Sequence, residues 1–160
     1  MSEFTRFSAD VMIAYAHQES KILGRNLWRV MKGFKYYVHN ETSGQWVDVP
    51  RGYLMDGASV PQFLWSVIPP WGSYGAATIV HDILCEYLQL TVEGVPCKIT
   101  RKQADDILLE AMEVLGVDHY DVIKISGAVN AYRRIKNVTQ ANWDPKKAAL
   151  EAKWVAANPE

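Results

Sequence analysis

A histidine and an aspartate stand side by side in a stretch with helical spacing. His81 belongs to an apolar stripe at i, i+4, i+7 and i+11, which it forms with Ala77, Leu84 and Leu88. Asp82 falls at the polar edge of the same predicted helix. A histidine within an apolar stripe needs a hydrogen-bond partner, because an unsatisfied buried polar group is costly. For this histidine alone, a core residue bonded to a backbone carbonyl is the favoured interpretation.

A second aspartate comes from the next predicted helix. Asp105 borders the apolar face of that helix, whereas Asp106 points towards water. If the two helices pack antiparallel, Asp105 reaches the imidazole of His81. A carboxylate on one imidazole nitrogen fixes the tautomer and leaves the other nitrogen to act as a general base. The pattern favours two interpretations equally: a catalytic dyad, or an ion-paired network that only joins two helices.

Further candidate residues lie near this pair. Asp82 and Asp56 are candidate ligands of a divalent cation, with Asp105 as a third nearby carboxylate. Oxygen ligands favour Ca²⁺ or Mg²⁺ over zinc, and these ions are the only cofactors that the sequence indicates. Ser59 is a candidate nucleophile in a triad with His81, although no G-x-S-x-G turn surrounds it. A capped helix start formed by Asp56 and Ser59 is the favoured alternative.

The elements that must position these residues change in character near residue 70. Before it, β-branched and aromatic runs predict strands over 11–17, 27–39, 45–49 and 53–55, with a hairpin turn at 40–44. After it, apolar periodicity predicts helices over 75–90, 100–115, 120–136 and 145–156. The predicted fold is therefore α+β: an N-terminal antiparallel hairpin or meander packed on a C-terminal bundle of three or four helices.

Helix-end signals divide the chain further. Thr100 and Gln103 have the spacing of a capping box, and Asp144-Pro145 is a favourable helix start. Leu150 and Trp154 lie at i, i+4 on the last helix and need a surface to pack against. We therefore predict a single α+β domain over 1–137 and a helical extension over 138–160, which docks on the domain or on a second copy of the chain.

Length and net charge limit the classes of protein to which this chain can belong. A chain of 160 residues predicts one domain with its own core. The 17 basic and 18 acidic residues give a net charge of −1, so the overall balance does not indicate nucleic-acid binding. The first residues lack the pattern of a signal peptide, so we expect no secretion by that route. No run of 18 apolar residues occurs, so we expect no transmembrane segment.

A longer pattern around these residues is similar to a known family. The chain resembles the phage-encoded "domain of unknown function 1353" family over roughly residues 4–136. The residues that carry the resemblance are Asp56-Gly57-Ala58-Ser59-Val60-Pro61, Pro69-Pro70-Trp71-Gly72, His81-Asp82, Arg101 and Ala104-Asp105. The resemblance implies a bacteriophage or prophage origin, and with it a location in the bacterial host cytoplasm or in the virion. It assigns no activity.

A weaker, local resemblance concerns chemistry. Ala77-x-x-x-His81-Asp82, followed by Ala104-Asp105, is similar to compact bacterial and parvoviral phospholipase A2 domains. That resemblance implies that His81 is a general base, that Asp82 binds calcium and that Asp105 orients the histidine. Cys85 stands where those domains have a tyrosine, and their glycine-rich calcium loop is absent unless residues 56–58 replace it. Lipid hydrolysis is therefore one member of a broader hydrolase hypothesis.

Three functions follow from these observations. The leading hypothesis is a phage accessory hydrolase whose site holds Asp56, Ser59, His81, Asp82 and Asp105. The first alternative is a virion or assembly protein, associated with the tail or capsid, that binds phage structural proteins and uses the His/Asp network only structurally. A further alternative is a host-interaction factor that binds a bacterial protein. In each case the C-terminal helix is a candidate surface for self-association.

Overall fold

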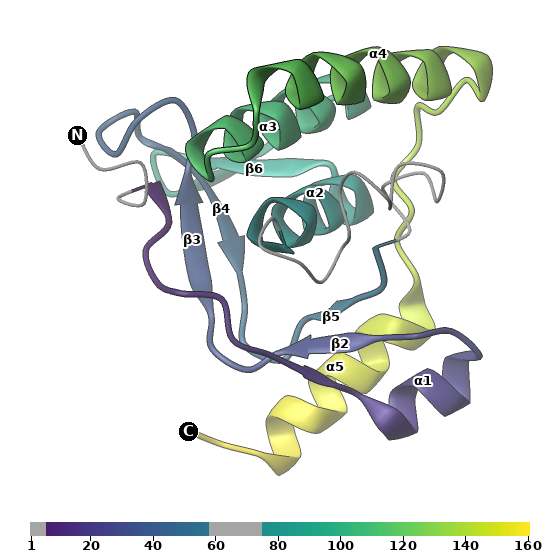
Figure 1. The fold of residues 1–160 in the computed structure, drawn as a ribbon. Helices are drawn as coiled ribbons and strands as arrows, with labels where there is room; N and C mark the ends of the chain where they lie inside the picture. The colour runs from purple at the N-terminus through teal and green to yellow at the C-terminus, as the bar shows by residue number, and fades with distance from the viewer. Residues whose placement is uncertain (1–5, 58–74) are drawn as a thin grey trace.

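The computed structural model describes residues 6–57 and 75–160, and their arrangement confirms an α+β fold (Figure 1). Within this part of the chain there are two antiparallel sheets and five helices. In chain order the elements are β1 (Ile13–Tyr15), α1 (His17–Leu23), β2 (Trp28–Val30), β3 (Phe34–Tyr37), β4 (Gln45–Val49), β5 (Leu54–Met55), α2 (Gly75–Tyr87), β6 (Gln89–Val92), β7 (Val95–Lys98), α3 (Arg101–Val114), α4 (His119–Ile135) and α5 (Pro145–Ala157).

The predicted strand over 27–39 is two strands in different sheets. β2 pairs with β1 and β5 in a three-stranded sheet, whereas β3 pairs with β4 in a four-stranded sheet of order β3-β4-β6-β7. The chain passes between the sheets at Gly33, where an added Cβ would lie 3.2 Å from the backbone of both Val49 and Arg51. Glycine fits here because the two backbones approach so closely. The predicted hairpin of β3 and β4 is confirmed.

The prediction that strands and helices segregate near residue 70 is wrong for one hairpin. The helix predicted over 75–90 ends at Tyr87, and the chain then forms β6 and β7. Glu93 and Gly94 join these strands with φ of 49° and 80°, as a tight hairpin turn requires. β6 pairs with β4, so a strand from the helical half completes the first sheet.

The predicted strand over 11–17 is likewise shortened. Only Ile13–Tyr15 pairs with β2, and α1 follows at once. α1 has seven residues and ends at Gly24, whose φ of 69° is the left-handed conformation typical of a helix end. A helix this short has too few turns for its periodicity to be recognised in the sequence.

α2 lies at the centre of the molecule and contacts β4, β5 and α3 (Figure 1). Its residues are buried almost all round, including both Ile79 and Leu84. The expectation that Asp82 lies at a polar edge is therefore wrong, since this side chain is buried as well. A helix covered on all sides has no solvated face, and each of its polar residues must find a partner in the protein.

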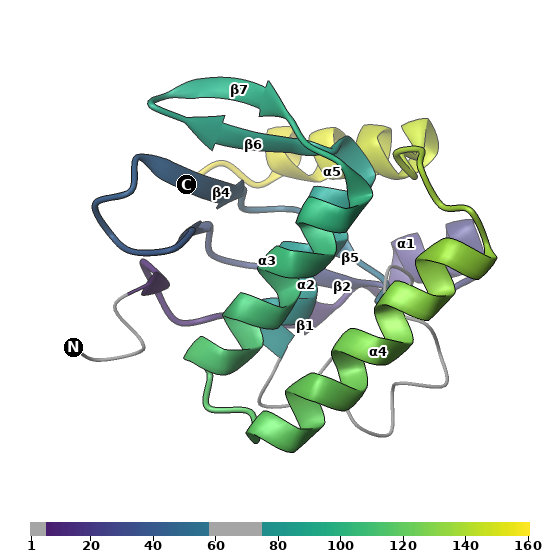
Figure 2. The ribbon, with the colours of Figure 1, turned by 90° about the horizontal axis from the view of Figure 1, so that it is seen from above.

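The predicted capping box of α3 is confirmed. Thr100 Oγ1 accepts a hydrogen bond from the backbone N–H of Gln103 at 3.1 Å, and Gln103 Oε1 accepts one from the N–H of Thr100 at 2.8 Å. α3 packs between α2 and α4 (Figure 2). This bundle forms the upper layer of the molecule in Figure 1. None of the helices in the described ranges is long and apolar enough to cross a membrane.

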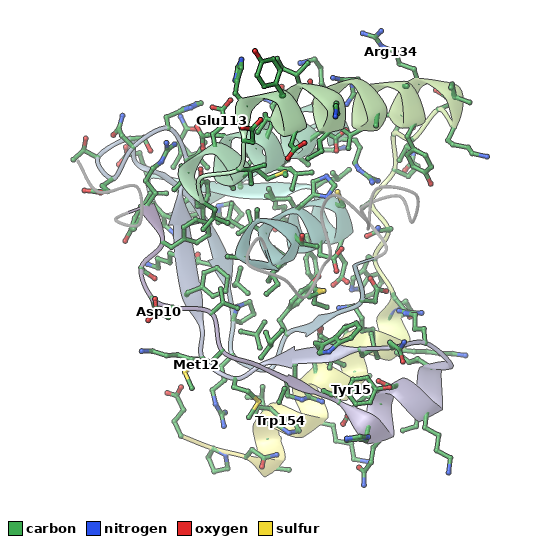
Figure 3. All side chains as sticks on the ribbon, viewed as in Figure 1. Asp10, Met12, Tyr15, Glu113, Arg134 and Trp154 are labelled. Carbon is green, nitrogen blue, oxygen red and sulfur yellow. The ribbon has the colours of Figure 1, made fainter. Side chains whose placement is uncertain are left out.

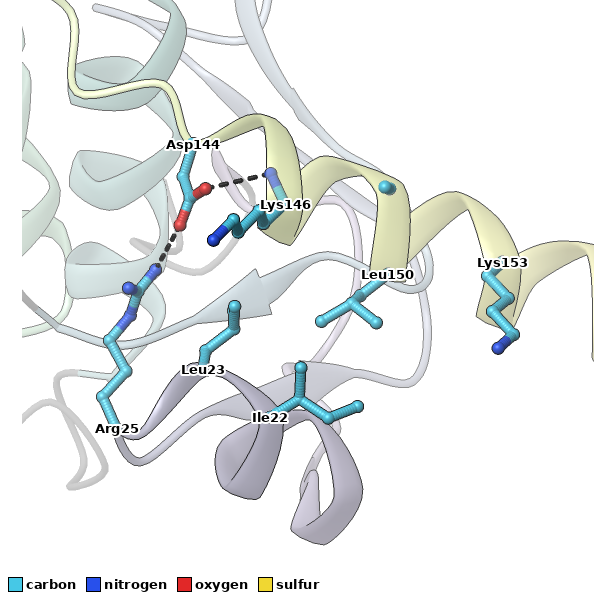
Figure 4. A pocket seen from close by; sticks show the side chains of 8 residues that line it. Ile22, Leu23, Arg25, Asp144, Lys146, Leu150 and Lys153 are labelled. Carbon is cyan, nitrogen blue, oxygen red and sulfur yellow. Dashed lines mark hydrogen bonds and ion pairs between the residues drawn. The ribbon is translucent and has the colours of Figure 1, made fainter.

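The predicted terminal helix forms and docks on the three-stranded sheet and α1. Asp144 caps it by accepting from the N–H of Lys146 at 3.0 Å, and the same carboxylate pairs with Arg25 at 3.0 Å (Figure 4). Leu150 packs against the small apolar cluster that Leu27 and Leu54 form.

The far end of α5 is held by stacking. The guanidinium groups of Arg29 and Arg51 lie 4.5 and 4.6 Å from the ring centroid of Trp154. Such cation–π contacts stabilise by about 0.5–1 kcal/mol each at exposed sites, and by more where the pair is desolvated. An added Cβ at Gly52 would lie 2.6 Å from Val155 Cγ2, so glycine lets α5 approach the chain there.

Candidate functional site

The central pair of the site is His81 on α2 and Asp105 on α3. The N–H of Ile99 bonds to the carbonyl of Leu88, so the end of α2 meets the start of α3 and the two helices run antiparallel. Asp105 Oδ1 then lies 2.7 Å from His81 Nε2. The predicted contact between these two side chains is confirmed, and both are buried.

Two arginines complete the surroundings of Asp105. Arg133 Nη1, from the last turn of α4, donates to Asp105 Oδ2 at 2.5 Å. Arg101 Nε, one turn before Asp105 on α3, lies 3.9 Å from Oδ1. The carboxylate is therefore held by side chains from three helices, α2, α3 and α4. This arrangement fixes its orientation towards the imidazole.

The same contacts keep Asp105 ionised. Burial alone would raise the pKa of its carboxyl, because a charged group loses solvation. The hydrogen bond and charge of His81, the hydrogen bond of Arg133 and the charge of Arg101 outweigh burial and lower that pKa below its ordinary value of 3.8. Asp105 is therefore an anion at neutral pH, and it favours the tautomer of His81 with the proton on Nε2.

Sequence reasoning named Arg101 only as part of the family resemblance and did not place either arginine in the site, although a signal existed for each. Arg133 lies four residues after Val129 and so continues the buried face of the helix predicted over 120–136. Arg101 lies four residues before Asp105, on the same side of its helix. When a basic residue lies on the buried face of a helix and a buried carboxylate is close by, an ion pair between them is predicted.

Cys85 lies one turn after His81 and also faces this pair. Its Sγ is 3.4 Å from His81 Nε2, and a potential ligand atom of each of Cys85, His81 and Asp105 lies within 4.8 Å of the others. Burial raises the pKa of the Cys85 thiol, so the sulfur is protonated at neutral pH. With two guanidinium groups already on Asp105, this trio is better suited to hydrogen bonding than to holding a metal cation.

Asp82 faces a different set of groups from those around Asp105. Its Oδ2 accepts hydrogen bonds from the backbone N–H of Asp56 at 3.2 Å and of Gly57 at 3.1 Å. The Asp56 carboxylate pairs with Arg25 Nε at 2.9 Å. Asp56 and Asp82 both line a cleft of about 260 Å³ whose lining residues are mostly charged. Asp105 is not among them. The structure therefore brings Asp56 and Asp82 together but leaves the third predicted carboxylate with the histidine.

These contacts bear on the predicted cation site. Residues 56 and 57 present N–H groups to Asp82, whereas a cation requires oxygen ligands. Asp56 and Asp82 fit Ca²⁺ or Mg²⁺ only if Arg25 leaves Asp56. Ser59, the predicted nucleophile, lies outside the described residues. Metal binding at Asp56 and Asp82 thus stays a prediction.

A buried lysine from α5 reaches the same cleft. Lys147 Nζ lies 2.8 Å from Glu86 Oε1 on α2 and 2.8 Å from Glu151 Oε2, and it donates to the carbonyl of Leu54 at 2.8 Å. Burial raises the pKa of Glu86 above its ordinary value, and the charge and hydrogen bond of Lys147 oppose that shift. No local pattern predicts this contact, because it joins residues 61 positions apart in the chain.

One comparison with known proteins covers the residues of the site. The family model described as "Protein of unknown function (DUF1353)" matches residues 28–125, a range that includes His81, Asp82 and Asp105. An "Uncharacterized protein y4jT" of Sinorhizobium fredii is 38% identical over 64 residues, which are 39% of this chain and 18% of that protein. The match thus spans less than a fifth of that relative. No solved structure gives a significant match.

Proposed function

Since the chain belongs to the DUF1353 family, whose description assigns no activity, we propose a function from the site itself: a hydrolase in which His81 activates a water molecule and Asp105 orients the imidazole. The observation that carries this proposal is the 2.7 Å contact between His81 Nε2 and an aspartate that its surroundings keep ionised. A carboxylate in this position is what a histidine general base requires.

The proposed reaction uses both nitrogens of His81. Nε2 carries the proton that is shared with Asp105, and Nδ1 carries the lone pair. Nδ1 accepts a proton from the water that attacks the substrate, and the negative charge of Asp105 stabilises the imidazolium that forms. The imidazolium then gives this proton to the leaving group as the substrate bond breaks. Arg101 and Arg133 act as positioning residues, because they hold Asp105 and touch neither water nor substrate in this scheme. No step is routed through a metal ion.

The direct experiment compares His81→Gln and Asp105→Asn with the unaltered protein on ester, phospholipid, peptidoglycan and phosphodiester substrates. His119→Gln is the matched control, since His119 is exposed at the start of α4. We expect hydrolysis of one substrate class, lost by at least 100-fold in His81→Gln and unchanged in the control. If the unaltered protein hydrolyses none of these substrates and both site variants lose only stability, the proposal fails.

A second candidate function is favoured by one observation: the side chain of His81 is almost completely buried, with 1% of it exposed. A sealed His–Asp–Arg network is typical of a structural role, as in a virion or assembly protein of a phage. Mass spectrometry of purified phage particles from a host that carries this gene separates the two candidates. Stoichiometric copies in the particle favour the structural protein, whereas absence from the particle together with activity in the host cytoplasm favours the enzyme.

A further inference from the structure

Five basic side chains gather at one cleft between β7, the start of α3 and the end of α4. The cleft has a volume of about 390 Å³, within the roughly 300–1,000 Å³ that is common for small-molecule sites. The basic residues that line it are Lys98, Arg101, Lys102, Arg133 and Arg134. They come from three separate elements, which the fold brings to one place.

The carboxylates close to these groups do not balance their charge. Asp105 takes the contacts of Arg101 and Arg133, and Asp106 pairs with Lys102 at 2.9 Å. Within the described part of the chain, five positive charges are therefore paired with two negative ones, an excess of three.

Two of the five cations lack an ion pair. Among the described residues, no carboxylate lies within 4.0 Å of the charged group of Lys98 or Arg134. Both residues are exposed, and Figure 3 shows Arg134 extending from α4 away from the body of the protein. Because both side chains are exposed and belong to residues that line the cleft, they are free to turn towards an anion that enters it.

Helix ends explain only part of this cluster. Basic residues in the last turn of a helix complement its dipole, which accounts for Arg133 and Arg134 on α4. It does not account for Lys98 on β7 or for Arg101 and Lys102 at the start of α3, where the positive end of the helix dipole already favours anions. At that end Asp105 and Asp106 offset Arg101 and Lys102. Neither the helix dipole nor an ion pair within the described residues accounts for Lys98.

We propose that this cleft binds an anion that contains two or more linked phosphate groups. Guanidinium groups match the geometry of phosphate oxygens, and Thr100 and Thr139 add hydroxyl donors at the rim. Because the cations come from three elements, a chain of phosphates, which offers oxygens along its length, suits the cleft better than a single phosphate does. The inference concerns binding alone and holds whether or not His81 is catalytic.

The test is isothermal titration calorimetry of the full chain with inorganic pyrophosphate at constant ionic strength. We expect saturable binding that is tighter than that of orthophosphate. Lys98→Gln and Arg134→Gln should each weaken it about tenfold, the effect of losing one charge-assisted hydrogen bond. Lys153→Gln on α5 is the matched control and should bind as the unaltered protein does. Both test positions are exposed, so neither substitution should disturb the fold.

Three results would overturn the inference. The first is no saturable binding of pyrophosphate by the unaltered protein. The second is an equal loss of binding in Lys153→Gln, which would show a general charge effect. The third is tighter binding of citrate, or binding of a single-stranded oligonucleotide but not of pyrophosphate, which would assign the cleft to another class of ligand.

Discussion

Asp105→Asn should destabilise the protein strongly. Among residues 6–57 and 75–160, Asp105 is the only carboxylate within ion-pairing distance of His81, Arg101 and Arg133. Asparagine keeps the shape of the side chain but removes the negative charge that Arg101 and Arg133 share. Their side chains are only 8% and 12% exposed, so water replaces the lost partner only in part. Removal of one partner from a buried ion pair costs about 3–5 kcal/mol of unfolding free energy.

The assay is thermal and urea unfolding of the purified chain. For a protein of this length, about 3–5 kcal/mol corresponds to a fall in Tm of roughly 6–20 °C. Asp106→Asn is the matched control: it is the next residue of α3, its side chain is 51% exposed, and it pairs with an exposed lysine. A surface pair of this kind is worth about 0–1 kcal/mol. The two neighbouring substitutions should therefore differ several-fold in their effect.

The same carboxylate gives the stability a pH dependence. The pKa of Asp105 is lowered in the folded state, so its ionisation stabilises the fold above the ordinary aspartate pKa of 3.8. That contribution is lost as the pH falls through the still lower folded-state pKa. The unaltered protein should therefore lose stability more steeply than Asp105→Asn below about pH 4.

A double substitution checks the cause. Arg133→Met added to Asp105→Asn removes one uncompensated guanidinium and should recover part of the lost stability, as replacement of buried ion pairs by apolar residues commonly does. If Asp105→Asn unfolds at the same temperature as Asp106→Asn, the three-helix ion network contributes nothing and the reasoning is refuted. If the double variant is less stable than Asp105→Asn, the loss has another cause.

Three further predictions concern other parts of the structure. Lys147→Met should lower the unfolding free energy by about 3–5 kcal/mol at pH 8, because it leaves the buried carboxylate of Glu86 without this cation. The loss should be smaller at pH 4.5, because the raised pKa of Glu86 lets its carboxylate gain a proton more readily. Gly52→Ala should separate α5 from the sheet, which calorimetry would register as a lower Tm and proteolysis as earlier cleavage after residue 138. Millimolar Ca²⁺ that displaces Arg25 from Asp56 should raise the Tm slightly, and Asp82→Asn should abolish that shift.

Each of these predictions has a matched control. Lys146→Met alters the exposed lysine next to Lys147 and should change the Tm little. Gly116→Ala has a similar positive φ of 81° but open space around its Cβ, so it measures backbone strain without a contact to α5. An effect of Gly52→Ala no larger than that of Gly116→Ala would argue against α5 as the cause. A Ca²⁺ shift that persists in Asp82→Asn would place the ion elsewhere.

Sequence periodicity was sufficient for the centre of the site because both residues lie on long helices. The stripe through His81 and the position of Asp105 beside Leu108 determine which way each side chain points, and the antiparallel packing then brings them together. The cap residues of α3 and α5 were equally predictable, since capping depends on neighbours within three positions.

The remaining features depend on contacts between distant residues. The apolar helical stripe of α2 runs on in the sequence as far as Leu88, next to the start of β6. Only the turn at Glu93-Gly94 therefore indicates the β6–β7 hairpin. The predicted strand over 27–39 is divided at Gly33, where its backbone packs closely against that of Val49. This contact lies 16 residues along the chain, so no local pattern predicts it. The burial of Asp82 follows from α2 lying between layers, which no property of α2 itself reveals.

The position of α5 also affects how the protein is made. Its lysine bonds to the carbonyl of Leu54, 93 residues earlier in the chain, and its capping aspartate pairs with Arg25, 119 residues earlier. On the ribosome, the β1-β2-β5 sheet therefore emerges long before the helix that covers it. Until α5 has been synthesised, the nascent chain exposes the apolar surface around Leu54 and holds Glu86 without its cation. We expect the incomplete protein to be recognised by chaperones and proteases during that interval, so a ribosome that stalls before residue 145 should yield a product that the cell degrades.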